Sequence, residues 1–316
     1  MGIIAAAATA AYRSGLSLSV GTLCMSAPPA AAPFSLDLAD GRLCGLRWGR
    51  PGARPVLALH GWLDNAASFT PLALALLEQC DIDLLAIDLA GHGHSDWLPG
   101  GYSQPAQAAQ LLGLLDTLGW RQVELIGHSM GASIAGLLAA ALPERVTRLV
   151  CIDALGPLSA PPEQSVTRLR EYLLGQQPGQ QRQPRPLPDP EHALRLRMQT
   201  NALSRRNAGL LVERGLRQDG HQWRWRTDPL LTHASAFYLH ESQVQALLAA
   251  IQCPTLLLQA EPPGRFIAPQ LQQQRQACIG GLQAIGLAGG HHLHMENAAA
   301  CAAAIIAFIN KDELKQ

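Results

Sequence analysis

The chain has 316 residues, which suits one large α/β domain with an insertion, or two small domains. Hydrophobic residues make up 48% of it and charged residues 15%, so the chain holds ample material for a buried core. Its 24 basic and 24 acidic side chains leave no net charge, which argues against nucleic acid or an anionic membrane as a partner. No apolar run reaches the ~18 residues that a membrane-spanning helix needs.

The first 33 residues differ in composition from the rest. Residues 1–33 are rich in Ala, Ser and Pro and carry one charged side chain, Arg13. They match a secretory signal peptide poorly, because early positive charge and a long apolar block are missing. We predict that 1–33 is a disordered leader and that folded patterning begins at Phe34.

The seven cysteines are scattered, and no two of them have Cys-x-x-Cys spacing. An odd count without such spacing is typical of reduced thiols rather than of a disulfide framework. We therefore expect a cytoplasmic protein.

Apolar strand runs alternate with helical segments along most of the chain, starting with a hairpin around Asp40-Gly41. This alternation predicts a mostly parallel central sheet with helices on both faces and a site at the carboxyl ends of the strands. Strands are expected at 34–38, 43–48, 55–59, 82–88, 122–126, 146–153, 254–259 and 283–287, and helices before 77 and at 104–118, 132–140, 269–278 and 297–310.

The alternation breaks between residues 156 and 231, where no run is typical of a buried strand. Residues 166–174 and 193–203 have helical spacing, and the Pro-, Gln- and Arg-rich residues 176–190 indicate a loop. We interpret 156–231 as an inserted helical cap. The core of the fold is then expected in two parts, 34–155 and 232–316.

A serine between two glycines stands between a predicted strand and a predicted helix, in Gly127-His128-Ser129-Met130-Gly131. This is the pattern of a nucleophile elbow, a turn so tight that neither glycine position has room for a Cβ. The strained serine projects its hydroxyl from the top of the sheet. We predict Ser129 as a nucleophile; the alternative is a turn whose serine only caps the helix.

A serine nucleophile needs a base within hydrogen-bonding distance, and the base needs an acid that fixes its tautomer. The base is expected in the loop after the last strand, where His291, His292 and His294 lie. We favour His291, because Gly289-Gly290 allows a sharp turn before it, and keep His292 as the alternative. A metal site is the competing interpretation of the cluster. We expect no metal and no cofactor, since no carboxylate or thiol cluster accompanies it.

Two carboxylates at strand ends could supply the acid. Asp153 ends the strand that follows the elbow helix, and Glu261 ends the next one. We favour Asp153, because it ends a β-branched strand directly before the predicted cap, and keep Glu261 as the alternative. The oxyanion hole needs two backbone N–H groups. Met130 at the start of the helix and Trp62 after the preceding strand are the candidates.

Four motifs in this order resemble the α/β-hydrolase superfamily over residues 34–310, and most of all its serine hydrolase-like branch. The resemblance implies the α/β-hydrolase fold, Ser129 as nucleophile, His291 as base and the amides of Met130 and Trp62 as oxyanion hole. The motifs are His60-Gly61-Trp62-Leu63-Asp64-Asn65, Gly91-His92-Gly93-His94-Ser95, the elbow, and Gly290-His291-His292-Leu293-His294-Met295.

The sequence departs from the superfamily pattern at one place. The strand ending at Gln259 usually finishes in Gly-x-x-Asp, but Pro263 stands where that aspartate would be. This departure favours Asp153, in an arrangement similar to that of some haloalkane dehalogenases. Ser129 in place of an aspartate argues against dehalogenase or epoxide hydrolase chemistry.

The expected function is hydrolysis of a small or medium carboxylic ester or related acyl bond through an acyl-enzyme. The partner is then a small acyl substrate, and the sequence leaves the oligomeric state open. A cofactor-free lyase or haloperoxidase-type activity with the same residues is one alternative, because fold-level resemblance does not fix the chemistry. A non-catalytic ligand-binding relative is another.

Overall fold

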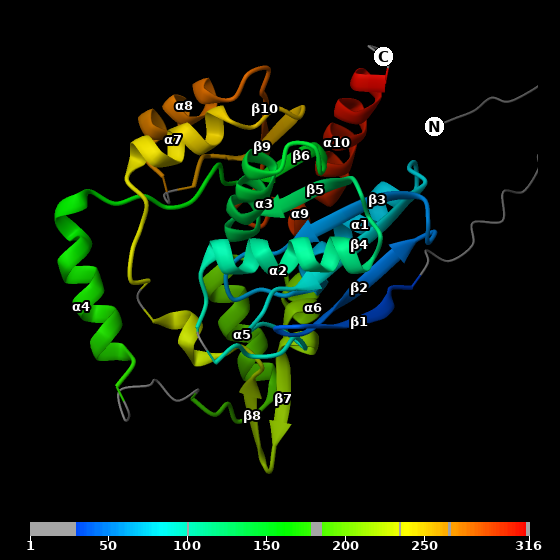
Figure 1. Ribbon diagram of the computed structural model, residues 1–316. Coiled ribbons are helices and arrows are strands. Elements are labelled where there is room, and N and C mark those ends of the chain that lie inside the picture. Colours follow the sequence, from blue (N-terminus) through cyan, green and yellow to red (C-terminus); the bar gives the residue numbers. More distant parts are fainter. Residues whose placement is uncertain (1–29, 100, 178–184, 234, 265–266, 314–316) are drawn as a thin grey trace, which may run out of the picture.

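The computed structural model describes residues 30–313 except 100, 178–184, 234 and 265–266 (Figure 1). Most of the predicted leader lies outside the described residues. Strand β1 begins at Ala32, ahead of the predicted start, because Ala32 and Pro33 pair with Arg47 and Leu46. No helix in the described part of the chain is long and apolar enough to cross a bilayer.

Eight strands form one sheet in the order β1-β2-β4-β3-β5-β6-β9-β10. Strands β1 and β2 form an antiparallel hairpin, β2 pairs antiparallel with β4, and every other pairing is parallel. The mostly parallel sheet predicted from the sequence is therefore confirmed. The strands are Ala32–Leu38, Gly41–Gly49, Arg54–Leu59, Ile82–Asp88, Val123–His128, Val146–Ile152, Thr255–Glu261 and Gln283–Ala288.

Helices cover both faces of this sheet (Figure 1). Successive residues of a strand point to opposite faces, so along β3 Leu57 packs in one apolar cluster and Ala58 in the other. One cluster includes α2 (Gln104–Thr117), α3 (Met130–Ala141) and α7 (Glu241–Ala249). The other includes α1 (Thr70–Leu77), which the 3₁₀ turn Ala66–Phe69 precedes, and α10 (Ala298–Glu313). Helix α8, Pro269–Cys278, precedes β10.

The segment between β6 and α7 holds more than the predicted helices. Helices α4 (Ser165–Gly175) and α5 (Pro190–Asn201) match the predicted spacing, and α5 stops where Ala202 takes a left-handed φ of 52°. Helix α6 (Arg205–Gly215) and the hairpin of β7 (Leu216–Asp219) and β8 (Gln222–Trp225) were not anticipated. The hairpin escaped the sequence pattern because each of its strands has only four residues.

This segment has a small core of its own, which joins it to the rest of the fold. Met295 of the short helix α9 (Leu293–Glu296) packs in that core, although α9 belongs to the loop after β10. Helix α4 has no buried residue and stands at the side of the molecule (Figure 1). The other members of the core are Leu187, Ala193, Leu194, Leu203, Ala208, Leu211, Val212 and Leu216.

Candidate active site

Ser129 sits in the turn between β5 and α3 with φ 51° and ψ −116°, a conformation that non-glycine residues rarely adopt. Both flanking positions must be glycine, because neighbouring backbone atoms leave no room for a Cβ. A Cβ on Gly131 would lie 2.0 Å from the carbonyl oxygen of Leu59, and one on Gly127 would lie 2.4 Å from the nitrogen of Ala132. The turn is thus a strained strand-to-helix elbow that presents the serine side chain above the sheet.

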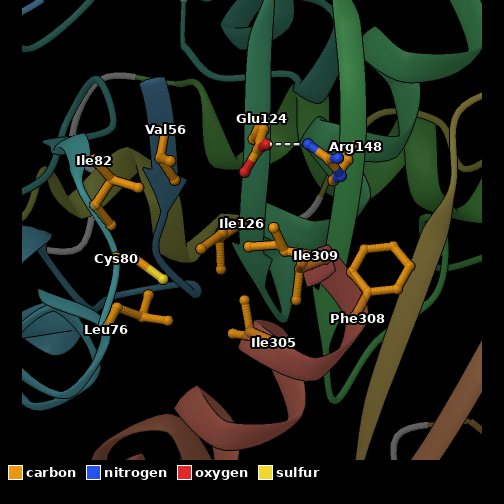
Figure 2. A pocket seen from close by; sticks show the side chains of 11 residues that line it. Val56, Leu76, Cys80, Ile82, Glu124, Ile126, Arg148, Ile305, Phe308 and Ile309 are labelled. Atoms are coloured by element: carbon orange, nitrogen blue, oxygen red, sulfur yellow. Dashed lines mark hydrogen bonds and ion pairs between the residues drawn. The ribbon is translucent and has the colours of Figure 1, made fainter. Parts of the chain in front are cut away.

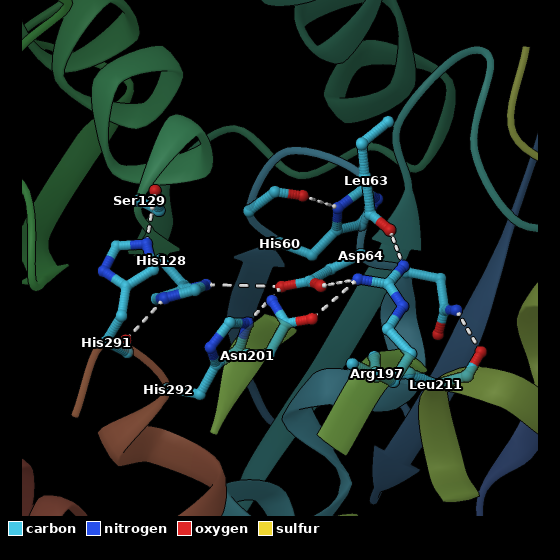
Figure 3. Close-up of polar contacts among 12 residues, drawn as sticks. His60, Leu63, Asp64, His128, Ser129, Arg197, Asn201, Leu211, His291 and His292 are labelled. Carbon is cyan, nitrogen blue, oxygen red and sulfur yellow. Dashed lines mark hydrogen bonds and ion pairs between the residues drawn. The ribbon is translucent and has the colours of Figure 1, made fainter. Parts of the chain in front are cut away.

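The structure brings Ser129, His291 and Asp153 into one hydrogen-bonded array. His291 Nε2 lies 2.9 Å from Ser129 Oγ, and His291 Nδ1 lies 2.7 Å from Asp153 Oδ2. Figure 3 shows the imidazole of His291 beneath the serine hydroxyl. The imidazole is 21% exposed and the Asp153 side chain 8%, so the array is shielded but reachable. A proton can pass from the hydroxyl to Nε2 while the carboxylate holds the N–H of Nδ1.

Asp153 is held in place by the strands beside it. Its backbone N–H donates to the carbonyl of Leu258, and the N–H of Ala260 donates to its Oδ1 at 3.0 Å. Its φ of 52° places it in the left-handed region just beyond the end of β6. The carboxylate is therefore fixed at the carboxyl edge of the sheet, with its second oxygen directed at His291.

The two alternative residues lie elsewhere. His292 Nε2 donates to Asp64 Oδ2 at 3.0 Å, and its side chain is 4% exposed. The side chain of Glu261 lies against β10, because a Cβ on Gly286 would come within 1.7 Å of its Oε1. Among these candidates, His291 and Asp153 are the pair that the structure aligns with the serine.

The two predicted oxyanion donors lie on adjacent segments. Met130 is the first residue of α3, where N–H groups have no partner within the helix. The start of α3 packs against the end of β3, since Gly131 touches the backbone of Leu59 and His60. Trp62 follows directly in the loop after β3. Its side chain is 53% exposed and its indole N–H donates to the carbonyl of Leu231.

Two buried histidines fix the loop that carries Trp62. His60 Nε2 accepts the N–H of Leu89 at 3.0 Å, and His92 Nε2 accepts the N–H of Leu63 at 3.3 Å. The two rings meet edge to face with centroids 4.8 Å apart. Both imidazoles act as acceptors through a neutral nitrogen, which is consistent with burial lowering their pKa, to about 3 for His92.

A second group of histidines lies behind His291. His128 Nε2 donates to the backbone carbonyl of His291 at 2.8 Å, which fixes the loop of the candidate base. The His128 ring lies 4.9 Å from that of His292 and 4.2 Å from that of His294, centroid to centroid. The position of His128 in the elbow, next to Ser129, is the sequence signal for this hydrogen bond.

Asp64, His128 and His292 together could reach a metal ion, since their ligand atoms lie within 4.8 Å of one another. The Asp64 carboxylate already accepts hydrogen bonds from His292 and from Arg197. A metal would have to displace the proton that His292 donates and would stand beside the guanidinium charge. The observed contacts therefore describe a hydrogen-bonded network around Asp64.

The buried histidines predict a loss of stability in acid. Burial lowers the pKa of His60, His92, His128 and His294, to about 3 for His92 and His294. In the unfolded chain the same imidazoles bind protons near pH ~6.5. Between about pH 6.5 and pH 3 the unfolded state therefore binds more protons at His92 and His294, and stability falls as the pH falls, by about 1.4 kcal/mol per pH unit for each of these two histidines. Urea unfolding at about pH 7.5, 6 and 5 measures this, and a free energy of unfolding that stays constant would contradict it.

A small hollow at the opposite end of the sheet does not belong to this site (Figure 2). It lies among the starts of β3, β4 and β5 and the helices α1 and α10, with the Glu124–Arg148 ion pair at its rim. Its free volume is about 10 Å³, room for roughly one water molecule. It is too small to accept a substrate.

Comparison with known proteins shows the family and the fold of the chain. The family model described as alpha/beta hydrolase fold matches residues 54–261. A serine hydrolase-like protein of Dictyostelium discoideum is 31% identical over 281 residues, which cover 84% of this chain and 78% of the relative.

Two solved structures are similar over most of the chain. One is a hypothetical protein of Pseudomonas aeruginosa PAO1, with a TM-score of 0.82 and 34% identity, covering 88% of this chain and 99% of its own. The other is a thioesterase domain from the curacin biosynthetic pathway, with a TM-score of 0.80 and 28% identity, covering 88% of this chain and 100% of its own. With its elbow serine and its mostly parallel sheet, the chain belongs to the α/β-hydrolase family, in the serine hydrolase-like branch.

Proposed function

We propose that the protein hydrolyses a small or medium carboxylic ester or thioester, with Ser129 as nucleophile, His291 as general base and acid, and Asp153 as the orienting carboxylate. The observation that carries the proposal is the continuous line of hydrogen bonds from Ser129 Oγ through His291 to Asp153. This arrangement converts a weak nucleophile into an alkoxide equivalent at neutral pH.

The reaction has two steps on the same residues. Ser129 Oγ attacks the carbonyl carbon while His291 Nε2 takes its proton, and the oxyanion accepts hydrogen bonds from the N–H groups of Trp62 and Met130. His291 then returns the proton to the leaving alcohol or thiol as the acyl-enzyme forms. Water, deprotonated by the same imidazole, attacks the acyl-enzyme and releases the carboxylic acid and Ser129.

The segment between β6 and α7 is the proposed cap, which selects the acyl group. It contributes Leu196 of α5, which is 39% exposed, and it contacts the exposed indole of Trp62 through Leu231. Exposed apolar side chains of this kind suit an acyl chain better than a charged group. The likeness to a thioesterase domain supports including thioesters among the substrates.

A chain-length series tests the proposal. Matched acyl p-nitrophenyl esters and acyl thioesters of two to twelve carbons are expected to show turnover at about neutral pH, with kcat/KM passing through a maximum. The chain length at which kcat/KM is highest measures the length of the acyl site. The ratio of ester to thioester rates measures the preference for an alcohol or a thiol as leaving group. Failure of the whole series to exceed the hydrolysis rate without protein would contradict the proposal.

A further inference from the structure

Arg197 belongs to α5, yet its guanidinium reaches the loop that carries Trp62. One terminal nitrogen donates to the backbone carbonyl of Leu63, and the other lies 3.3 Å from Asp64 Oδ1 (Figure 3). The Arg197 side chain is 12% exposed and that of Asp64 2%, so the ion pair is buried. The guanidinium also lies 5.1 Å from the ring centre of Trp225, which restricts its position from the other side.

Asp64 connects this arginine to the loop of the candidate base. Its Oδ2 accepts the N–H of His292 Nε2, and His292 is the neighbour of His291 in the chain. Burial alone would raise the pKa of Asp64, but His292 and Arg197 hold that pKa well below its usual range, so Asp64 is a carboxylate. One buried carboxylate thus joins the loop after β3, the loop after β10 and helix α5.

The residue between Trp62 and Asp64 has an unusual backbone conformation. Leu63 has a φ of 61°, which a branched side chain rarely adopts without support from its surroundings. Its N–H donates to His92 and its carbonyl accepts from Arg197, so both of its polar backbone groups are held. The N–H of Trp62 belongs to the peptide whose carbonyl accepts the N–H of Asp64 at 3.1 Å, so its direction depends on this turn.

We propose that Arg197 is a positioning residue for hydrolysis: from α5 it clamps Leu63 and Asp64 so that the N–H of Trp62 points at the developing oxyanion. The inference rests on the proposed function. Without the guanidinium, the Leu63 carbonyl and the buried Asp64 carboxylate each lose a partner, and the strained loop relaxes. The oxyanion donor is then misdirected even though Ser129, His291 and Asp153 remain in place.

The test compares Arg197→Met, Arg197→Lys and the control Arg195→Met, an exposed arginine of the same helix. Removing one oxyanion donor typically costs 10²–10³ in kcat, so a misdirected one should cost about 10- to 100-fold, with KM changed by less than about threefold. Arg197→Lys should recover part of kcat, since an ammonium can pair with Asp64 but does not present the planar fork that reaches Leu63 as well. Arg195→Met should keep the kcat of the unchanged protein.

Each outcome decides between the two claims. Suppose that the unchanged protein turns over esters and that Arg197→Met keeps the same kcat, whether or not its KM rises. The positioning role is then wrong, and the proposed function stands. If the unchanged protein turns over neither esters nor thioesters, the proposed function itself fails. If Arg197→Met does not fold, Arg197→Lys decides: a lower kcat at unchanged KM supports the clamp, and an unchanged kcat overturns it.

Discussion

Ser129→Ala is expected to lower kcat for a short p-nitrophenyl ester by about a million-fold, because the oxygen that becomes acylated is gone. No other hydroxyl of the array replaces the one that Ser129 shares with His291. A water molecule in place of that hydroxyl would not form the acyl-enzyme. KM should change little, since the hydroxyl contributes mainly to the transition state. The measurement is the steady-state rate with saturating substrate.

A serine in the helix that follows Ser129 provides a matched control. Ser133 is buried and donates its hydroxyl to the carbonyl of Gly156, away from His291. Ser133→Ala should cost about 1 kcal/mol of stability and leave kcat close to that of the unchanged protein. Equal activity of Ser129→Ala and Ser133→Ala would remove the nucleophile assignment.

Asp153→Asn is expected to lower kcat by about 10⁴-fold with the fold intact. The asparagine amide can donate to Nδ1 of His291 and so favours the tautomer whose Nε2 carries the proton, which cannot accept one from Ser129. It also removes the charge that stabilises the imidazolium formed during attack. The measurement is kcat over a range of pH, with circular dichroism as the folding check.

Glu261→Gln is the matched control for the acid. Glu261 ends β9 as Asp153 follows β6, but its side chain lies over Gly286 of β10. The substitution should leave kcat near that of the unchanged protein. The opposite pattern, with Glu261→Gln inactive and Asp153→Asn active, would show that the acid has been assigned to the wrong strand end.

The site residues could be predicted where the backbone conformation requires particular residue types nearby. The elbow of Ser129 needs glycine on both sides, and the sharp turn before His291 follows two glycines, so both positions carry signals within a few residues. Asp153 is favoured by its place at the end of a β-branched strand and by Pro263 in place of the usual aspartate, and the structure places Asp153 beside His291. The catalytic roles themselves stay predictions until activity is measured.

The contacts made by the segment between β6 and α7 could not be predicted in this way. Arg197 and Asp64 are far apart in the chain, and nothing in the local pattern of α5 marks one arginine as buried. Helices α6 and α7 were missed although apolar residues follow helical spacing in both, at 208, 211 and 212 and at 244, 247 and 248. Strands β7 and β8 are too short for a periodic pattern. The contacts of Arg197 depend on tertiary packing rather than on local sequence.

The most direct test of the account is intact-protein mass spectrometry after treatment with a fluorophosphonate, followed by peptide mapping. We expect one phosphonyl group on the unchanged protein, attached to Ser129, and none on Ser129→Ala. A probe that adds no mass to the unchanged protein, or that labels Ser129→Ala to the same extent, would contradict the claim that Ser129 is an activated nucleophile.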